Sequence, residues 1–283
     1  MAALPSPLWN AQYLHDRLAA PDLVVVDCRF DLMNPDAGRR AYQAGHIPGA
    51  RYADLNRDLS SPVTPGVTGR HPLPEPAVLA AKLGAWGISS DSLVVAYDDA
   101  SGALAARLWW LLHWLGHERT VVLDGGFTAW KTRAGAIETS EPVPLPATFV
   151  PRVQTHLVVD VKTVLAASRS GTPLLLDARA APRFYGDEEP IDPIPGHIPG
   201  ARSLPFGTLL DAGLFATPEK VRARFEQTLS DAPAAEAICY CGSGVTACHL
   251  LLGAVHAGLP MPKLYAGSYS EWLTDPTRGV ERR

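Results

Sequence analysis

A cysteine in a glycine-rich turn is the residue of this chain best suited to nucleophilic chemistry. Cys241 follows a short apolar strand, predicted over 237–240, and begins the sequence Cys-Gly-Ser-Gly-Val-Thr-Ala, after which an apolar helix runs to Gly258. The backbone N–H groups of such a turn and of the following helix start favour an anion. For cysteine this anion is the thiolate, so we expect the pKa of Cys241 to lie below the free value of about 8.5. The pattern predicts a nucleophile.

The elements that position this turn occur twice. The sequence Gly-His-Ile-Pro-Gly-Ala-Arg is found at 45–51 and again at 196–202, each time after an apolar strand that ends in Asp-x-Arg, at 27–29 and 177–179. A spacing of about 150 residues exceeds the roughly 20–50 residues of a solenoid repeat. It predicts two homologous domains, 1–135 and 151–283, and the Pro-rich stretch 136–150 reads as an extended linker between them.

The strands of both halves predict an α/β fold. Runs rich in Val, Leu and Ile without polar alternation, such as 93–97 and 120–123, are typical of parallel strands buried on both faces. Between these two strands lies an apolar helix, predicted over 103–115, which makes a βαβ crossover. The second half repeats this order. Each domain is therefore predicted to be a mostly parallel sheet with helices on both faces.

The two halves differ at the position of the nucleophile. Aligning the strand 95–97 with 238–240 places Asp98 where Cys241 stands, followed by a loop one residue longer. A carboxylate is no soft nucleophile, and two adjacent acids, Asp98 and Asp99, would repel an anionic substrate. We expect the first domain to be structural or to contribute to the wall of a cleft, and the second to carry the chemistry.

Composition excludes several classes of protein. The net charge is −4 and charged residues make up 19% of the chain, which gives no basis for a nucleic-acid or membrane-surface partner. The first residues lack the charged and apolar segments of a secretory signal, and the apolar run at 108–112 is too short to span a bilayer. The four cysteines are too few for a disulfide framework and lack the paired spacing of a zinc site. We expect a cytoplasmic, reduced, monomeric protein without a bound metal.

Together these features resemble the two-domain sulfurtransferases of the rhodanese family. The resemblance rests on the duplicated Gly-His-Ile-Pro-Gly-Ala motif and on the loop that begins at Cys241, which within the family is similar to that of 3-mercaptopyruvate sulfurtransferases. It covers nearly the whole chain. It implies two rhodanese-like α/β domains, the first catalytically degenerate, and a persulfide intermediate on Cys241 with no metal or organic cofactor.

The chemistry implied is sulfur transfer in two half-reactions. Cys241 would take sulfur from a small-molecule donor and pass it to cyanide or to a thiol acceptor such as thioredoxin, with ping-pong kinetics. The backbone amides of the turn, at Gly242, Gly244, Val245 and Thr246, would hold the charge of the persulfide as an oxyanion hole does. The Thr246 hydroxyl could also cap the following helix.

Other residues bear on the donor. Arg183 matches a family arginine that binds the donor carboxylate, a role suited to the planar guanidinium. A second family arginine is missing, because 187–193 contains no basic residue, so Arg202 or an arginine of the first half would have to replace it. His71, in the sequence His-Pro-Leu-Pro, would with Ser243 relay a proton to the leaving enolate. Asn56 and Asp58 are both candidates for the partner of His71.

Alternative functions remain open from the sequence. The first is a thiosulfate sulfurtransferase, which the neutral side chains of the loop argue against, and the second is a persulfide carrier for a partner protein. A cysteine phosphatase needs Cys-x5-Arg, whereas the sixth residue after Cys241 is Ala247. The remaining cysteines are expected in the core. We expect bracing roles for the residues that both halves keep, which are His46, His197, Arg29 and Arg179.

Overall fold

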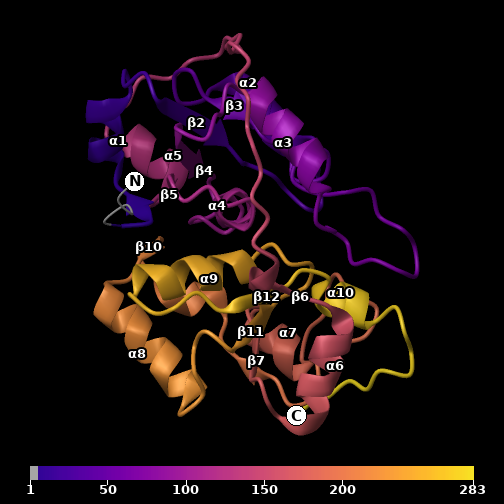
Figure 1. Cartoon of the computed structure of the whole chain (residues 1–283). Coiled ribbons are helices and arrows are strands. Elements are labelled where there is room, and N and C mark those ends of the chain that lie inside the picture. The colour runs from indigo at the N-terminus through magenta and orange to yellow at the C-terminus, as the bar shows by residue number, and fades with distance from the viewer. Residues whose placement is uncertain (1–5) are drawn as a thin grey trace. The chain divides into compact units, whose positions relative to one another are not determined.

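The computed structural model describes residues 6–283, which divide into two compact units (Figure 1). Unit 1 contains the described residues up to Ser61 together with Pro74–Gln154, and unit 2 contains Pro62–Leu73 and Thr155–Arg283. The chain thus passes between the units three times, after Ser61, after Leu73 and after Gln154. The segment 62–73, which carries His71, belongs with the second unit although it lies in the first half of the sequence.

The Pro-rich segment 136–150 is attached to unit 1. Glu138 exchanges two backbone hydrogen bonds of 2.9 Å with His46, and its carboxylate accepts the Gly49 N–H at 2.7 Å. Farther along, the N–H of Ala147 donates to the carbonyl oxygen of Gly84 at 2.9 Å. The sequence predicts an extended linker here, and the segment indeed has little regular structure, but it lies along the unit that precedes it.

Unit 1 is built on a five-stranded parallel sheet of order β1-β5-β4-β2-β3. Its strands are β1 (Leu8–Trp9), β2 (Leu23–Asp27), β3 (Arg51–Tyr52), β4 (Leu93–Tyr97) and β5 (Thr120–Leu123). Its helices are α1 (Ala11–Arg17), α2 (Ala37–Ala44), α3 (Pro76–Ala85), α4 (Ala105–Trp114) and α5 (Gly126–Thr132). The predicted helix at 103–115 corresponds to α4.

Unit 2 repeats this sheet as β6-β12-β11-β7-β8, again parallel throughout. Its strands are β6 (Val158–Val159), β7 (Leu175–Asp177), β8 (Arg202–Ser203), β11 (Ile238–Tyr240) and β12 (Lys263–Tyr265), and a short antiparallel pair is formed by β9 (Leu210–Asp211) and β10 (Leu214–Phe215). Its helices are α6 (Val161–Ser170), α7 (Ala181–Tyr185), α8 (Pro218–Leu229), α9 (Ala247–His256) and α10 (Ser268–Trp272), with 3₁₀ turns at Thr155–Leu157 and Phe206–Leu209. The predicted α/β class, with two mostly parallel sheets, is confirmed.

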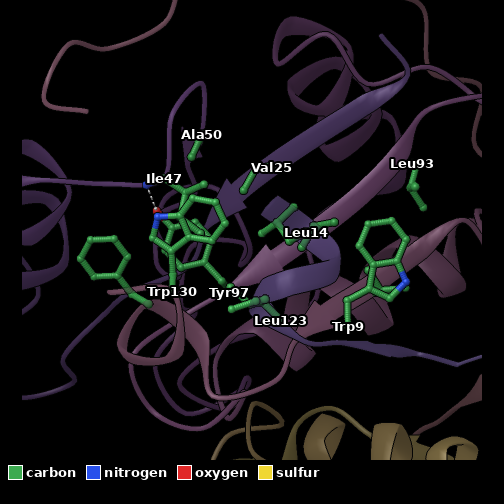
Figure 2. Packing of buried hydrophobic residues seen from close by; sticks show 13 residues of the cluster. Trp9, Leu14, Val25, Ile47, Ala50, Leu93, Tyr97, Leu123 and Trp130 are labelled. Atoms are coloured by element: carbon green, nitrogen blue, oxygen red, sulfur yellow. Dashed lines mark hydrogen bonds between the residues drawn. The ribbon is translucent and has the colours of Figure 1, made fainter. Parts of the chain in front are cut away.

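The core of unit 1 explains why its strands are continuously apolar. One face of the sheet packs against α1 and α5, where Leu14, Tyr97 and Trp130 are completely buried (Figure 2). The opposite face is covered by the apolar helix α4, in which Trp109 and Trp110 are also completely buried. Strands covered on both faces need apolar residues at every position.

In unit 2 the corresponding cluster joins α6 and α10 to one face of the sheet through residues such as Ile238, Tyr240 and Trp272. Helices α8 and α9, coloured orange to yellow in Figure 1, pack against each other on the other face. Tyr269 belongs to this cluster and is completely buried. Trp272 and Tyr269 are thus packing residues.

The motifs that occur in both halves of the chain have the same local geometry in each unit. Arg29 makes a buried, two-pronged ion pair with Asp27 and also donates to the Gly45 carbonyl at 2.7 Å. Arg179 repeats this arrangement with Asp177 and Gly196. Each arginine therefore ties a strand end to the Gly-His-Ile-Pro turn, which is the bracing role that the sequence predicts.

The histidines of the two turns have equivalent structural contacts. His46 donates from Nδ1 to the Tyr42 carbonyl at 2.8 Å and stacks on that ring at 3.9 Å between centroids. His197 donates to the Phe184 carbonyl at 2.8 Å and stacks at 3.7 Å. Both contacts fix the turn against the preceding helix.

Over the described residues, no helix combines the length and apolar character that crossing a membrane requires.

Candidate functional site

Cys241 lies at the carboxyl end of β11, the central strand of the unit 2 sheet. This edge of an open parallel sheet is where α/β proteins commonly place their ligands. The side chain is 2% exposed, and its Sγ receives the backbone N–H groups of Ser243 at 3.4 Å and Gly244 at 3.1 Å. Two N–H donors aimed at one sulfur stabilise negative charge on it.

The turn after Cys241 is held from the segment that begins α10. The Cys241 N–H donates to Ser268 Oγ at 3.0 Å, and its carbonyl oxygen accepts the N–H of Tyr269 at 2.9 Å. Ser268 is completely buried and has a φ of 55°, a left-handed conformation that is uncommon for residues other than glycine. Ser268 and α10 therefore fix the direction in which the Cys241 turn leaves the strand.

Gly244 is required by the shape of the turn. Its φ is 75°, and a Cβ at this position would collide with the carbonyl oxygen of Ala266. Val245 is buried, at 5% exposure. Thr246 occupies the position before α9, but its hydroxyl makes no capping hydrogen bond to that helix. The expectation of a Thr246 cap is therefore wrong, because the backbone of Thr246 is already helical (φ −69°, ψ −17°) rather than extended as at a capped start.

His71 and Ser243 lie together in unit 2. His71 Nδ1 is 2.8 Å from Ser243 Oγ, and the two residues are 4% and 8% exposed. This is the pairing expected from the sequence, made across 172 positions of chain. Of the proposed partners of His71, Asp58 belongs to unit 1 and makes an ion pair of 2.6 Å with Lys82.

Arg183 is at the turn as predicted, but it is engaged by two carboxylates of its own unit. Its Nε and Nη2 donate to Glu189, the closest contact being 2.7 Å, and Nη2 also donates to Asp192 at 2.8 Å. Both acids come from the stretch 187–193, where the sequence shows no basic residue. Burial alone would raise the pKa of Glu189, but hydrogen bonds from Arg183 and from the N–H groups of Asp192 and Ile191 hold it below its usual value.

Arg70 is a second arginine at this turn, which the sequence reasoning did not single out. Its Nη1 forms an ion pair with Asp192, and its backbone N–H donates to Ser270 Oγ at 3.0 Å. A Cβ placed on Gly242 would lie 2.7 Å from Arg70 Nη2 and 3.6 Å from Arg183 Nη2, so both guanidinium groups reach the residue next to Cys241. Arg202, the other candidate for this role, instead donates to the Thr228 carbonyl at 2.6 Å.

Unit 1 has a different anion in the corresponding turn. Asp98 follows β4, the central strand of its sheet, and is completely buried. Its two carboxylate oxygens accept four backbone N–H groups, those of Ala100, Gly102, Leu104 and Ala105, at 2.7–2.9 Å. Burial raises the pKa of Asp98 above its usual value, although these four hydrogen bonds oppose the rise. The anion-binding turn is thus filled by a side chain of the turn itself.

The remaining cysteines lie in the core. Cys28, Cys239 and Cys248 are all free and buried. Burial raises the pKa of the Cys28 thiol well above its usual value and does the same for Cys239. Neither thiol is suited to act as a nucleophile, because the thiolate is the reactive form.

Several residues of the site carry no recognisable sequence signal. Ser268, Arg70, Glu189 and Asp192 are each ordinary in their local sequence, and the contacts of Ser268, Arg70 and Asp192 join segments far apart in the chain. One sequence feature pointed to a different arrangement of charges at the site: the stretch 187–193 has acidic residues where the family resemblance requires a basic one. Arg70 also directly precedes the His-Pro-Leu-Pro sequence that begins at His71.

Comparison with known proteins agrees with the fold. The Rhodanese-like domain family matches the chain twice, at residues 10–133 and 160–275. The chain therefore belongs to the rhodanese family, and it is a sulfurtransferase.

Its relatives include proteins named for two different sulfur donors, 3-mercaptopyruvate and thiosulfate. The chain is 54% identical to a probable 3-mercaptopyruvate sulfurtransferase of Pseudomonas aeruginosa, over 96% of this chain and 97% of the relative. It is 39% identical to a putative thiosulfate sulfurtransferase, SseB, of Mycobacterium tuberculosis, over 100% and 99% of the two chains. The crystal structure of the 3-mercaptopyruvate sulfurtransferase SseA from Escherichia coli superimposes with a TM-score of 0.82 at 31% identity, over 94% of this chain and 100% of that one.

Proposed function

We propose that this enzyme moves sulfur from 3-mercaptopyruvate to a thiol or to cyanide through a persulfide on Cys241. The observation that carries the proposal is the position of Cys241 Sγ under two backbone N–H groups, at 3.1 and 3.4 Å, beside two guanidinium groups. A thiolate in this turn is a nucleophile, and the arginines suit a donor with a carboxylate.

In the first half-reaction the Cys241 thiolate attacks the sulfur of 3-mercaptopyruvate. A sulfur–sulfur bond forms, the carbon–sulfur bond of the donor breaks, and its electron pair leaves with the carbon as the enolate of pyruvate. His71 and Ser243, 2.8 Å apart, are placed to pass a proton to that enolate. The amides of the turn, from Gly242 to Thr246, hold the negative charge of the persulfide.

In the second half-reaction an acceptor thiolate, such as that of thioredoxin, attacks the outer sulfur of the persulfide. The sulfur–sulfur bond to Cys241 breaks, and its electron pair returns to Cys241 as a thiolate. Cyanide acts in the same way and gives thiocyanate. Since the two half-reactions share only the sulfur-loaded enzyme, the steady-state kinetics should be ping-pong.

The test is sulfur transfer from 3-mercaptopyruvate and from thiosulfate, measured side by side on the wild type and on Cys241→Ser. We expect kcat/KM to be at least about tenfold higher for 3-mercaptopyruvate, which corresponds to about 1.4 kcal/mol, and activity to be lost in the variant. Incubation with donor alone should add the mass of one sulfur atom to the wild type and none to the variant. Cys248→Ser, at a buried cysteine of α9, is the matched control and should keep both properties.

Two other outcomes would point to the alternative functions. Preference for thiosulfate would assign the enzyme to the donor class named for the Mycobacterium tuberculosis relative. Slow release of sulfur to small thiols, together with fast transfer to a single protein, would identify a persulfide carrier. Activity that survives Cys241→Ser would contradict all three readings, because each depends on this thiolate.

A further inference from the structure

Arg70 is attached to the Cys241 turn through its backbone. Its N–H donates to Ser270 Oγ at 3.0 Å, and the N–H of Ser270 donates to the Gly242 carbonyl, also at 3.0 Å. All of these residues belong to unit 2. The position of Arg70 beside the turn is therefore set by main-chain contacts as well as by its side chain.

The side chain of Arg70 keeps donors that the protein does not use. Its Nε is buried and has no hydrogen-bond partner among the described residues. Its Nη2 lies over Gly242, while Nη1 is taken by Asp192. A buried guanidinium N–H without a partner is costly, and a ligand that accepts from it removes this cost. The side chain as a whole is 28% exposed, so part of it faces solvent although Nε does not.

Asp192 holds the two arginines together. One carboxylate oxygen pairs with Arg70 Nη1 and the other accepts from Arg183 Nη2 at 2.8 Å, and the side chain is only 1% exposed. A carboxylate that bridges two guanidinium groups fixes the orientation of both planes. Asp192 therefore determines which N–H groups of Arg70 and Arg183 remain free to face Gly242.

Asp192 and its neighbours also balance the charge of the site. The buried ion pairs join three guanidinium groups, from Arg70, Arg179 and Arg183, to three carboxylates, from Asp177, Glu189 and Asp192. The arginines thus offer directed hydrogen bonds without a surplus of positive charge. A donor with one negative charge can use these hydrogen bonds, whereas a dianion brings twice as much uncompensated charge into a cluster that is already neutral.

We propose that Arg70 is a further donor-binding residue, that Asp192 is its positioning residue, and that this pair makes the site favour a singly charged carboxylate donor over the dianion thiosulfate. The inference rests on the proposed function, since it assigns the donor subsite of the same Cys241 reaction. Arg70 then takes the place of the basic residue that is missing from 187–193.

The first experiment replaces Arg70. In Arg70→Gln we expect KM for 3-mercaptopyruvate to rise about 10- to 100-fold, the range of one hydrogen bond to a charged group, with kcat within about threefold of wild type. Arg70→Lys keeps the positive charge but lacks the paired N–H donors of the guanidinium group, so its KM should lie between those of wild type and Arg70→Gln. The rate of transfer from preformed persulfide to a thiol should be unchanged. A merely structural defect would slow this second half-reaction as well. Arg169→Gln, at an exposed arginine of α6, is the matched control.

The second experiment replaces Asp192. In Asp192→Asn the ratio of kcat/KM for thiosulfate to that for 3-mercaptopyruvate should rise at least about tenfold, because the site gains one net positive charge. Asp192→Glu keeps the charge and should keep the wild-type ratio. If the asparagine variant does not fold, Glu189→Gln makes the same change of charge in this cluster of ion pairs, and the same rise in the ratio is expected.

The outcomes are distinguishable from failure of the proposed function. If wild type does not use 3-mercaptopyruvate, the proposed function is wrong, whatever the variants do. If wild type uses it but Arg70→Gln has the wild-type KM, or loses both half-reactions equally, the binding role of Arg70 is overturned. An unchanged donor ratio in Asp192→Asn overturns the charge argument.

Discussion

At the residue scale, the two units differ in the side chain that follows the central strand. In unit 2 this residue is Cys241, whose sulfur receives two N–H groups of its turn. In unit 1 it is Asp98, whose carboxylate receives four. Both turns bind negative charge, but only a thiolate can form a bond to sulfur and release it again. Under the proposed mechanism, the nature of this one side chain decides which unit can catalyse the transfer.

The contact between His71 and Ser243 leads to a prediction about the first half-reaction. Ser243→Ala and His71→Gln should each slow the single-turnover release of pyruvate about 100-fold, which is the usual contribution of a positioned proton donor. The double variant should lose little more than either single variant, because groups that act as a unit are not additive. Rapid-quench measurement of pyruvate against pH checks this expectation.

His156→Gln, at an exposed histidine of unit 2, is the control for the proton relay and should retain the wild-type rate. Thermal unfolding of all variants separates loss of chemistry from loss of fold. Pyruvate release at the wild-type rate in Ser243→Ala would remove the relay from the mechanism.

At the scale of the element, the Cys241 turn depends on two glycines for different reasons. Gly244 has a φ of 75° and faces the Ala266 carbonyl, so a side chain there opposes rigid backbone. A Cβ on Gly242 would instead meet the end of the flexible Arg70 side chain. The first glycine maintains the path of the turn, and the second leaves space for the guanidinium group.

We predict that alanine at these two glycines has separable effects. Gly244→Ala should cost roughly 1–3 kcal/mol of stability through backbone strain and should abolish persulfide formation, because the N–H that faces Sγ is displaced. Gly242→Ala should keep wild-type stability and raise KM for the donor by moving Arg70. Urea unfolding and steady-state kinetics measure both, with Gly207→Ala, whose Cβ would meet no atom within 4 Å, as control. Equal effects of the two substitutions would contradict this division of roles.

Sequence patterns were sufficient for the elements and for the position of Cys241 at the end of its strand, but not for the ion pairs around it. Apolar runs and the Gly turns reveal the strands and the helix α4 because each is a local signal along the chain. Cys241, Ser243, Arg183 and His71 stand in recognisable motifs, and the structure brings all four into unit 2. Arg70 and Asp192 are 122 residues apart, and no local pattern reports a contact of this range. The prediction of a Thr246 cap was wrong because the preference of threonine for helix starts does not specify the backbone angles of this residue.

At the scale of the whole molecule, the two units share a fold but bury different titratable groups. In unit 1, burial lowers the pKa of His117 to about 4, and the neighbouring His113 contributes to the shift. Its ring is 4% exposed, and Nε2 has no hydrogen-bond partner within the described part of the chain. His117 is therefore neutral in the folded protein over a pH range in which it is charged in the unfolded chain.

This difference predicts an acid-sensitive unit 1. Between pH 6.5, the unfolded pKa, and about 4, the unfolded chain binds one more proton at His117, so the free energy of unfolding falls as pH falls. The slope is about 1.4 kcal/mol per pH unit for one proton. Denaturant unfolding from pH 7 to 4 should show a steeper loss in wild type than in His117→Gln. The surface variant His15→Gln should follow wild type, and parallel curves for wild type and His117→Gln would refute the assignment.

The Asp98 turn of unit 1 also has an evolutionary consequence. A buried anion-binding turn without an anion leaves several N–H groups unsatisfied, which is a cost to folding. Asp98 supplies the anion from within the chain, so the N–H groups of this turn are satisfied without a thiol or a bound ligand. Gene duplication could thus release one domain from selection for chemistry without releasing it from selection for folding.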